Sequence, residues 1–170
     1  TKAGVNLSAA GADSDEHKAI VNSANGELKA AKDVTVSATQ GSIDNGGKLD
    51  AGKNVTVTAT KGSIENSGAV TADENASLTA GVNISNTAAI EAKQAVKLSA
   101  TNNIQNSVAG TINAGTDASM TATNGYIDND GAVNAGTTAS MTATNGYIDN
   151  DGAVTAVADV TMKAGSYIDN

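Results

Sequence analysis

Apolar residues recur in short alternating segments, and the set of segments repeats every 20 to 23 residues. In the longest segment two apolar residues and an Ala are separated by single residues, nearly all Ser or Thr, as in Val55 to Ala59. Alternation with period two is typical of a strand with one buried face. The second apolar position is occupied by Leu7, Val36, Val57, Leu78, Leu98, Met120, Met141 and Met162.

Two shorter apolar segments complete each repeat. One carries an Ile in every copy, at Ile20, Ile43, Ile64, Ile84, Ile104, Ile127, Ile148 and Ile168. The other carries an apolar residue followed two positions later by Ala, as at Val70 and Ala72. No segment has the i, i+3, i+4 spacing of a helix. Three strands per repeat predict an all-β parallel β-helix, or β-solenoid, of about eight coils, with residues 1–170 as a single unit.

One segment departs from the repeat. Residues 10–19, which include the only His (His17), are predicted to form a loop outside the coils. Elsewhere the strand segments keep their spacing, and the extra residues fall between them. Insertions are therefore expected in the turns.

Composition requires a narrow interior and limits the partners. The chain has no Phe, Trp, Pro or Cys, so large side chains cannot fill a wide core. Its formal charge is −8 without a single Arg, and residues 101–170 hold one Lys against seven Asp. Such a surface cannot neutralise a phosphate backbone, which argues against nucleic acid. No apolar run is long enough to span a membrane, so we expect no membrane insertion.

An Asn follows each Ile by two residues. Alternation places this Asn on the buried face, where amides stacked one coil apart can donate and accept along the axis. The alternative is that Asn is favoured there because it tolerates a left-handed turn conformation, and the two interpretations are compatible. The predicted asparagine ladder comprises Asn22, Asn45, Asn66, Asn86, Asn106, Asn129, Asn150 and Asn170.

Catalytic chemistry is not indicated. The acids fall at outward or turn positions of a regular repeat, which forms no cleft for a hydrolase. Lyases of this architecture use a basic residue beside acids, and the chain has no Arg. No Ser-His-Asp or metal-ligand spacing is present, and His17 is interpreted as a solvated loop residue. We expect no enzyme activity and no cofactor.

Two outward columns are candidate binding surfaces. Tyr126, Tyr147 and Tyr167 each precede an Ile, and they form either a sugar- or partner-binding strip or, as we prefer, a local stabilising stack. The second column has four acids near one another, namely Asp128, Asp130, Asp149 and Asp151. Their spacing of one coil allows a Ca²⁺ site, but we prefer the alternative of a solvated acidic strip.

The repeats resemble those of filamentous haemagglutinin. The resemblance rests on Ile-Asp-Asn followed by Gly-containing turns and by Ala-Gly before a Val-Thr strand, as between Ile43 and Val57, and it covers nearly the whole chain. It implies a right-handed parallel β-helix from an exoprotein of two-partner secretion, which an outer-membrane transporter exports unfolded from a Gram-negative cell. No segment resembles that family's secretion domain or toxin domain.

The resemblance implies a structural role outside the cell. We expect the shaft of a secreted or surface-displayed adhesin, used in cell adhesion or biofilm contact, that holds a distal binding or toxin region away from the cell. One alternative is a module that binds glycans or proteins through the Tyr and Asp columns. Another is a filament subunit that associates end to end. The repeat is already under way at Thr1 and closes at Asn170, so we expect a piece of a longer fibre.

Overall fold

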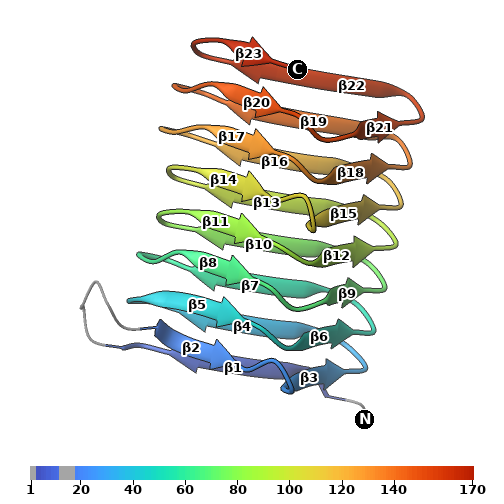
Figure 1. Ribbon diagram of the computed structural model, residues 1–170. Coiled ribbons are helices and arrows are strands. Elements are labelled where there is room, and N and C mark those ends of the chain that lie inside the picture. The colour runs from blue at the N-terminus through green and yellow to red at the C-terminus, as the bar shows by residue number, and fades with distance from the viewer. Residues whose placement is uncertain (1–2, 12–17) are drawn as a thin grey trace.

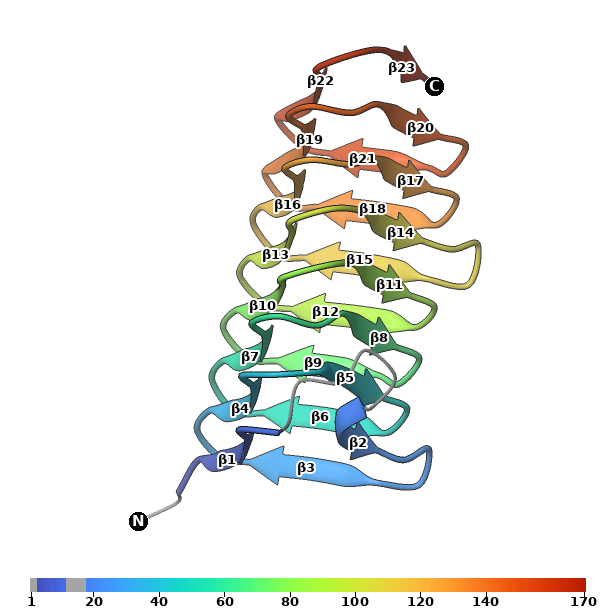
Figure 2. The same ribbon diagram turned by 90° about the vertical axis from the view of Figure 1, so that its left-hand side faces the viewer.

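The protein is a stack of parallel β coils. The computed structural model describes residues 3–11 and 18–170, and these contain strands and turns but no helix (Figure 1). Each full coil contributes one strand to each of three sheets of eight, eight and seven strands, which gives seven complete coils and an incomplete eighth. We number these sheets 1 to 3 in the order in which each coil enters them. Toward the C-terminus the chain winds through them in a right-handed sense (Figures 1 and 2).

Sheet 1 is formed by the longest alternating segments. Its strands are β1 (Val5–Ala9), β4 (Val34–Ala38), β7 (Val55–Ala59), β10 (Ala76–Ala80), β13 (Val96–Ala100), β16 (Ala118–Ala122), β19 (Thr138–Ala143) and β22 (Asp159–Ala164). Pairing is parallel and in register, so Val57, Leu78 and Leu98 lie in one line. The predicted second apolar column is thereby confirmed.

Sheet 2 carries the Ile and Asn columns. Its strands are β2 (Lys18–Asn22), β5 (Ser42–Asn45), β8 (Ile64–Asn66), β11 (Ile84–Asn86), β14 (Ile104–Asn106), β17 (Ile127–Asn129), β20 (Ile148–Asn150) and β23 (Ile168–Asp169). The predicted loop of residues 10–19 is too long at its C-terminal end, because Lys18 and Ala19 already belong to β2. The register of β2 shifts between Lys18 and Ile20, where the strand joins the regular coil.

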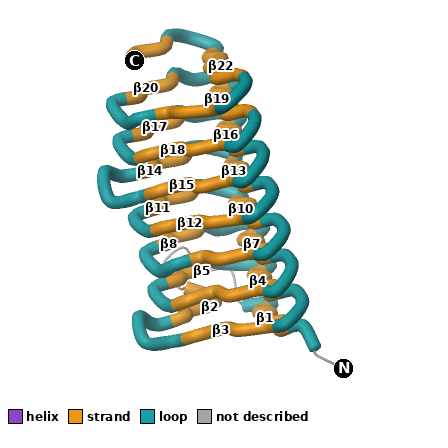
Figure 3. Tube along the Cα trace, turned by 90° about the vertical axis from the view of Figure 1, so that its right-hand side faces the viewer, coloured by secondary structure: helices purple, strands orange, loops and turns teal. Residues whose placement is uncertain are grey.

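Sheet 3 closes each coil. Its strands are β3 (Glu27–Ala30), β6 (Lys48–Ala51), β9 (Val70–Ala72), β12 (Ala89–Ala92), β15 (Thr111–Ala114), β18 (Ala132–Ala135) and β21 (Val154–Ala156). Figure 3 shows that the turns, in teal, differ in length while the strands, in orange, stay stacked. The insertions therefore lie in the turns, as expected.

The interior is a thin column of aliphatic side chains. Val34, Val55, Ile90, Leu98 and Ile104 have no exposed surface. The Ala that ends each strand of sheets 1 and 3 is also buried in the central coils, where small side chains let the walls of the coil approach. The coil therefore closes without a single aromatic core residue.

Candidate functional site

Buried Asn side chains form a continuous ladder along the axis. The amide Nδ2 of each Asn donates to the Oδ1 of the Asn in the next coil, from Asn22 to Asn170, over 2.7–2.8 Å. In the central coils these side chains are almost fully buried, with Asn86 and Asn129 at 0% exposure. The second amide hydrogen reaches a turn carbonyl in several coils, as from Asn129 to Gly131 over 3.1 Å. The ladder therefore satisfies a buried polar column.

Left-handed turn geometry does not explain the Asn column. Among the residues whose backbone is described, only Gly11 and Gly41 have a positive φ, of 25° and 78°. Every Asn of the ladder thus has an ordinary extended or right-handed backbone. The alternative interpretation is wrong for these residues, and the side-chain hydrogen bond is the reason for Asn.

A second type of ladder lies at the turns. The Oδ1 of Asp33 accepts from the backbone N–H and the side chain of Asn54, at 3.2 and 2.9 Å. Asn75 repeats both bonds to the Oδ1 of Asn54, at 3.2 and 3.1 Å. This column was not predicted, although its signal is visible in the sequence as a polar residue directly before the first apolar position of sheet 1.

The Tyr column is a stack of rings on the outer side of sheet 2. The ring centroids of Tyr126 and Tyr147 are 5.0 Å apart, and those of Tyr147 and Tyr167 are 4.9 Å apart, with interplanar angles of 14° and 3°. Both faces of Tyr147 are therefore covered by neighbouring rings. The surrounding rings also desolvate its hydroxyl, and this desolvation, with the nearby Tyr and Asp groups, raises the pKa of Tyr147.

The stack determines what a ligand can contact. A ligand that packs flat on an aromatic ring cannot reach Tyr147, because the neighbouring rings cover both of its faces. Tyr167, at the C-terminal end of the stack, is 56% exposed. Along the described stack the strip thus offers ring edges and hydroxyl groups to a ligand.

The Asp column runs beside the Tyr column. Asp128 and Asp149 are partners in the pairing of β17 with β20, and Asp149 pairs in turn with Asp169. Partial burial, followed by repulsion from Asp151, Asp169, Asp128 and Asp130, raises the pKa of Asp149. Over residues 3–11 and 18–170, no group of three or more His, Cys, Asp or Glu side chains converges in a way that can hold a metal ion. Ca²⁺ binding here stays a prediction.

Ion pairs distinguish the two halves of the rod. Lys18 contacts Asp44 at 2.6 Å and Glu65 at 3.1 Å, so one ammonium group ties three coils together. Asp50 accepts from Lys29 and Lys48, and these hydrogen bonds lower its pKa. In the described chain every such pair involves a Lys between Lys18 and Lys93. The Asp-rich coils beyond have none.

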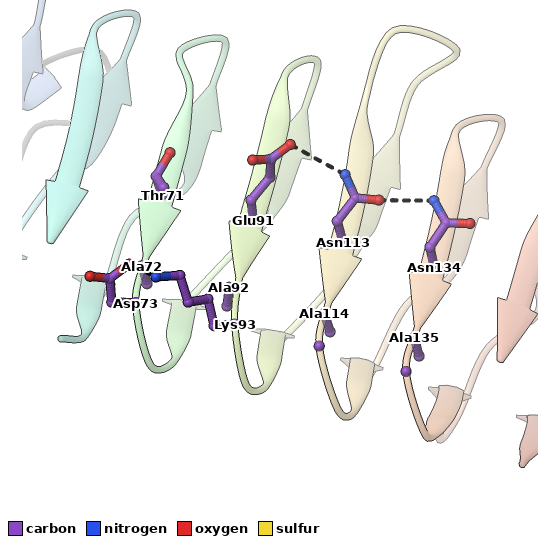
Figure 4. Close-up of a pocket in the computed structure, with 12 residues that line it drawn as sticks. Thr71, Ala72, Asp73, Glu91, Ala92, Lys93, Asn113, Ala114, Asn134 and Ala135 are labelled. Carbon is purple, nitrogen blue, oxygen red and sulfur yellow. Dashed lines mark hydrogen bonds and ion pairs between the residues drawn. The ribbon is translucent and has the colours of Figure 1, made fainter. Parts of the chain in front are cut away.

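A shallow groove of about 530 Å³ crosses the outside of sheet 3 (Figure 4). Along one side Glu91, Asn113 and Asn134 are hydrogen-bonded in series, at 3.4 and 2.9 Å. The Ala residues of β9, β12, β15 and β18 lie along its length. The Lys93–Asp73 ion pair, 2.7 Å long, lines one end, and glycines at 115 and 136 leave the other end open. This groove was not predicted, because it depends on small residues, Ala and Gly, that happen to adjoin in neighbouring coils.

Two further sequence predictions concern His17 and membrane insertion. His17 lies outside the described residues, which exclude 12–17. None of the described segments is a helix long and apolar enough to cross a membrane.

The stacked coils and the Asn ladder define the chain as a parallel β-solenoid. No protein-family model matches it, and neither does any curated protein or solved structure. The resemblance to filamentous haemagglutinin repeats therefore stays a prediction.

Proposed function

We propose that the chain is a structural shaft of a secreted or surface-displayed bacterial adhesin, which holds a distal binding or toxin region away from the cell. The observation that carries the proposal is the continuous parallel pairing of three sheets around a narrow aliphatic core. Each coil is hydrogen-bonded to the next along its strands, at its turns and through the Asn ladder. Bending the rod requires all of these bonds to be strained together.

The surface agrees with a spacer role. The outward positions of sheet 1 are mostly Ser and Thr, which favour exposed strands and carry no charge. Each coil adds about 4.8 Å of length, the usual distance between neighbouring strands. A shaft of this kind gains reach by adding coils and needs no other change.

Coil number provides a test. A binding domain of known target is fused after Asn170 and displayed on a bacterial surface, with none, two or four extra copies of residues 134–154 inserted. We expect capture of a target buried beneath a surface polymer layer to increase with coil number, while capture of free target stays constant. Capture that is independent of coil number would contradict the spacer role.

A binding module is the second candidate, favoured by the adjacent Tyr and Asp columns on the outside of sheet 2. A ligand there would be rich in hydroxyl groups, because it would meet Tyr hydroxyls, ring edges and carboxylates. Glycan-array binding by the wild type and by Tyr147→Ser tests this candidate. Binding that the substitution abolishes supports the module, and equal binding by both chains, or none by either, removes the column's role.

A further inference from the structure

Two Asn-Gly pairs lie one above the other in the turns that join sheet 1 to sheet 2, at the left of Figure 1. Asn124 and Gly125 belong to the turn from β16 to β17, and Asn145 and Gly146 to the turn from β19 to β20. Both Asn side chains are exposed, although a further coil is stacked on each side of them. Each pair therefore combines an accessible amide with the least hindered backbone nitrogen that a following residue can offer.

The spacing of the coils requires Gly at the second position of each pair. A Cβ added to Gly125 would overlap with the side-chain oxygen of Asn103 and lie 2.8 Å from the backbone oxygen of Asn102, in the preceding coil. A Cβ added to Gly146 would overlap with the backbone oxygen of Gly125. No larger residue fits there to shield the preceding Asn, so the exposed amide keeps an unhindered neighbour because of the stacking itself.

The atoms that would have to react are not held by hydrogen bonds. Among the described residues, the backbone N–H groups of Gly125 and Gly146 have no hydrogen-bond acceptor. Within the same part of the chain the two Asn side chains bond only to each other, from Asn145 Nδ2 to Asn124 Oδ1 over a long 3.3 Å. The side-chain carbonyl carbon of each Asn, Cγ, is thus able to turn onto the nitrogen of the following Gly.

The sequence contains two other Asn-Gly pairs, and neither is both exposed and free of hydrogen bonds. Asn45 is 2% exposed, and both ends of its amide are held in the ladder over 2.7 Å. The N–H of Gly46 also donates to a backbone oxygen of the preceding coil at 2.7 Å. Asn25 is exposed, but the N–H of Gly26 donates to a backbone oxygen of its own turn at 2.7 Å. The fold therefore treats the same dipeptide differently at different places.

We propose that Asn124 and Asn145 are sites of spontaneous deamidation. In each pair the Gly nitrogen attacks Cγ of the Asn, a C–N bond forms, and Nδ2 leaves as ammonia with the proton that the Gly nitrogen gives up. Water then opens the resulting succinimide ring at either of its carbonyl groups, which yields Asp or isoaspartate. Each site consumes one water and releases one ammonia, and the reaction needs no cofactor, oxidant or second protein.

The products fit the stack of coils. Each event replaces a neutral amide with a carboxylate, so two events change the formal charge from −8 to −10. Isoaspartate also lengthens the backbone by one carbon. Turns at this edge already differ in length, with three residues at 81–83 and 101–103 and four at 123–126 and 144–147. We therefore expect the coils to stay folded while the rod becomes more acidic. The inference is independent of the shaft role, because it needs only the stacked coils.

Intact-mass spectrometry of the folded chain tests the proposal. The wild type, Asn124→Gln, Asn145→Gln and the double variant are incubated at mildly alkaline pH, where the Gly nitrogen loses its proton more readily. Gln keeps an exposed amide, so the unfolding curves should match, but its longer side chain closes a larger and less favourable ring. We expect two mass steps for the wild type, one for each single variant and none for the double variant. Peptide mapping should find isoaspartate at both positions, which direct hydrolysis of the amide does not give.

Asn45 is the internal control, because it has the same Gly neighbour. Its amide reacts only after the ladder opens, so in the folded chain we expect it to deamidate at least about tenfold more slowly than Asn124. In urea the two rates should become similar. Equal rates at Asn45 and Asn124 in the folded chain, or equal mass gain by the wild type and the double variant, would overturn the proposal. So would a folded chain whose mass stays constant while the urea-unfolded chain deamidates.

Discussion

At the scale of single residues, one Asn per coil forms side-chain hydrogen bonds to both neighbouring coils, which no apolar residue can do at the same position. It points into the core, where an unpaired amide is costly, and it pairs with the identical group above and below. Position and residue type follow directly from the alternation Ile-x-Asn, which is why the ladder could be predicted. The turn ladder of Asp33, Asn54 and Asn75 was harder to predict, because polar residues at turns have several explanations.

Removing one amide from the ladder should cost much more than removing an exposed one. Asn86→Ala leaves Asn66 without its acceptor and Asn106 without its donor, and we expect a loss of about 1–3 kcal/mol in the free energy of unfolding. Equilibrium urea unfolding measures the loss. Asn134→Ala, which removes an exposed Asn from sheet 3, is the control and should cost much less. Equal costs would mean that the buried ladder adds nothing.

The pKa shifts of individual Asp residues predict opposite responses to acid. The pKa of Asp149 is raised in the folded state, so ionisation of this carboxyl destabilises the fold above that pKa. The penalty shrinks as the pH falls through the folded pKa and is gone below the unfolded value. The pKa of Asp33 is lowered by hydrogen bonds from the side chain and backbone of Asn54. Its contribution is present above the unfolded value, about 3.9, and is lost as the pH falls through the folded pKa.

Two substitutions separate these effects. Asp149→Asn should raise the melting temperature at neutral pH, and the gain should shrink with added salt and vanish in acid. Asp33→Asn should change the melting temperature in acid least, since the native carboxylate is then protonated. Thermal melts from neutral pH to below the Asp range provide the measurement. A melting temperature of Asp149→Asn equal to that of the wild type at neutral pH and low salt would contradict the repulsion.

At the scale of elements, register and the inward or outward side of each strand position were predictable, and the detailed geometry of the outer side chains was not. Sheet pairing places Tyr126, Tyr147 and Tyr167 in one column, and that column was evident from the sequence. Whether the rings lie flat on one another or spread apart depends on rotamers and on neighbouring turns, which the repeat pattern does not encode. The groove over sheet 3 was not predicted either. It arises because glycines at 115 and 136, in adjacent coils, have no side chains to fill the space.

The Tyr stack should contribute in proportion to the ring pairs that it contains. Tyr147→Ser removes two pairs and Tyr126→Ser removes one, and each pair is worth about 0.5–1.5 kcal/mol. Urea unfolding should therefore show roughly twice the loss for Tyr147→Ser. The near-ultraviolet circular dichroism reports on the same stack, because the chain has no other aromatic chromophore. Equal losses in the two variants would mean that the rings act independently.

At the scale of the whole molecule, stability comes from contacts between neighbouring coils. A single coil buries too few large side chains to offset the ordering of its backbone, so coils fold only on one another. Charge is distributed unevenly along the stack: residues 1–100 hold nine Lys and eleven acids, whereas residues 101–170 hold one Lys and seven acids. The number of coils and their approximate length were predictable, because they depend only on the repeat.

Removing a whole coil should preserve the fold. Deletion of residues 134–154 joins Val133 to Thr155 and leaves every column intact. We expect the circular dichroism per residue to be unchanged and the urea m-value to fall by roughly one eighth, in proportion to the surface removed. Deletion of residues 124–144, which removes the same number of residues but begins and ends within a turn, is a matched control for the choice of boundary. Loss of folding in both variants would contradict nearest-neighbour stabilisation.

The near identity of two adjacent coils has a consequence for inheritance. Residues 113–133 and 134–154 match at 20 of 21 positions. Coding DNA that repeated as closely would be able to misalign during replication. A slip of one such unit adds or deletes one complete coil and leaves every column continuous. Lineages that carry this sequence should therefore differ in the number of coils before they differ in the fold.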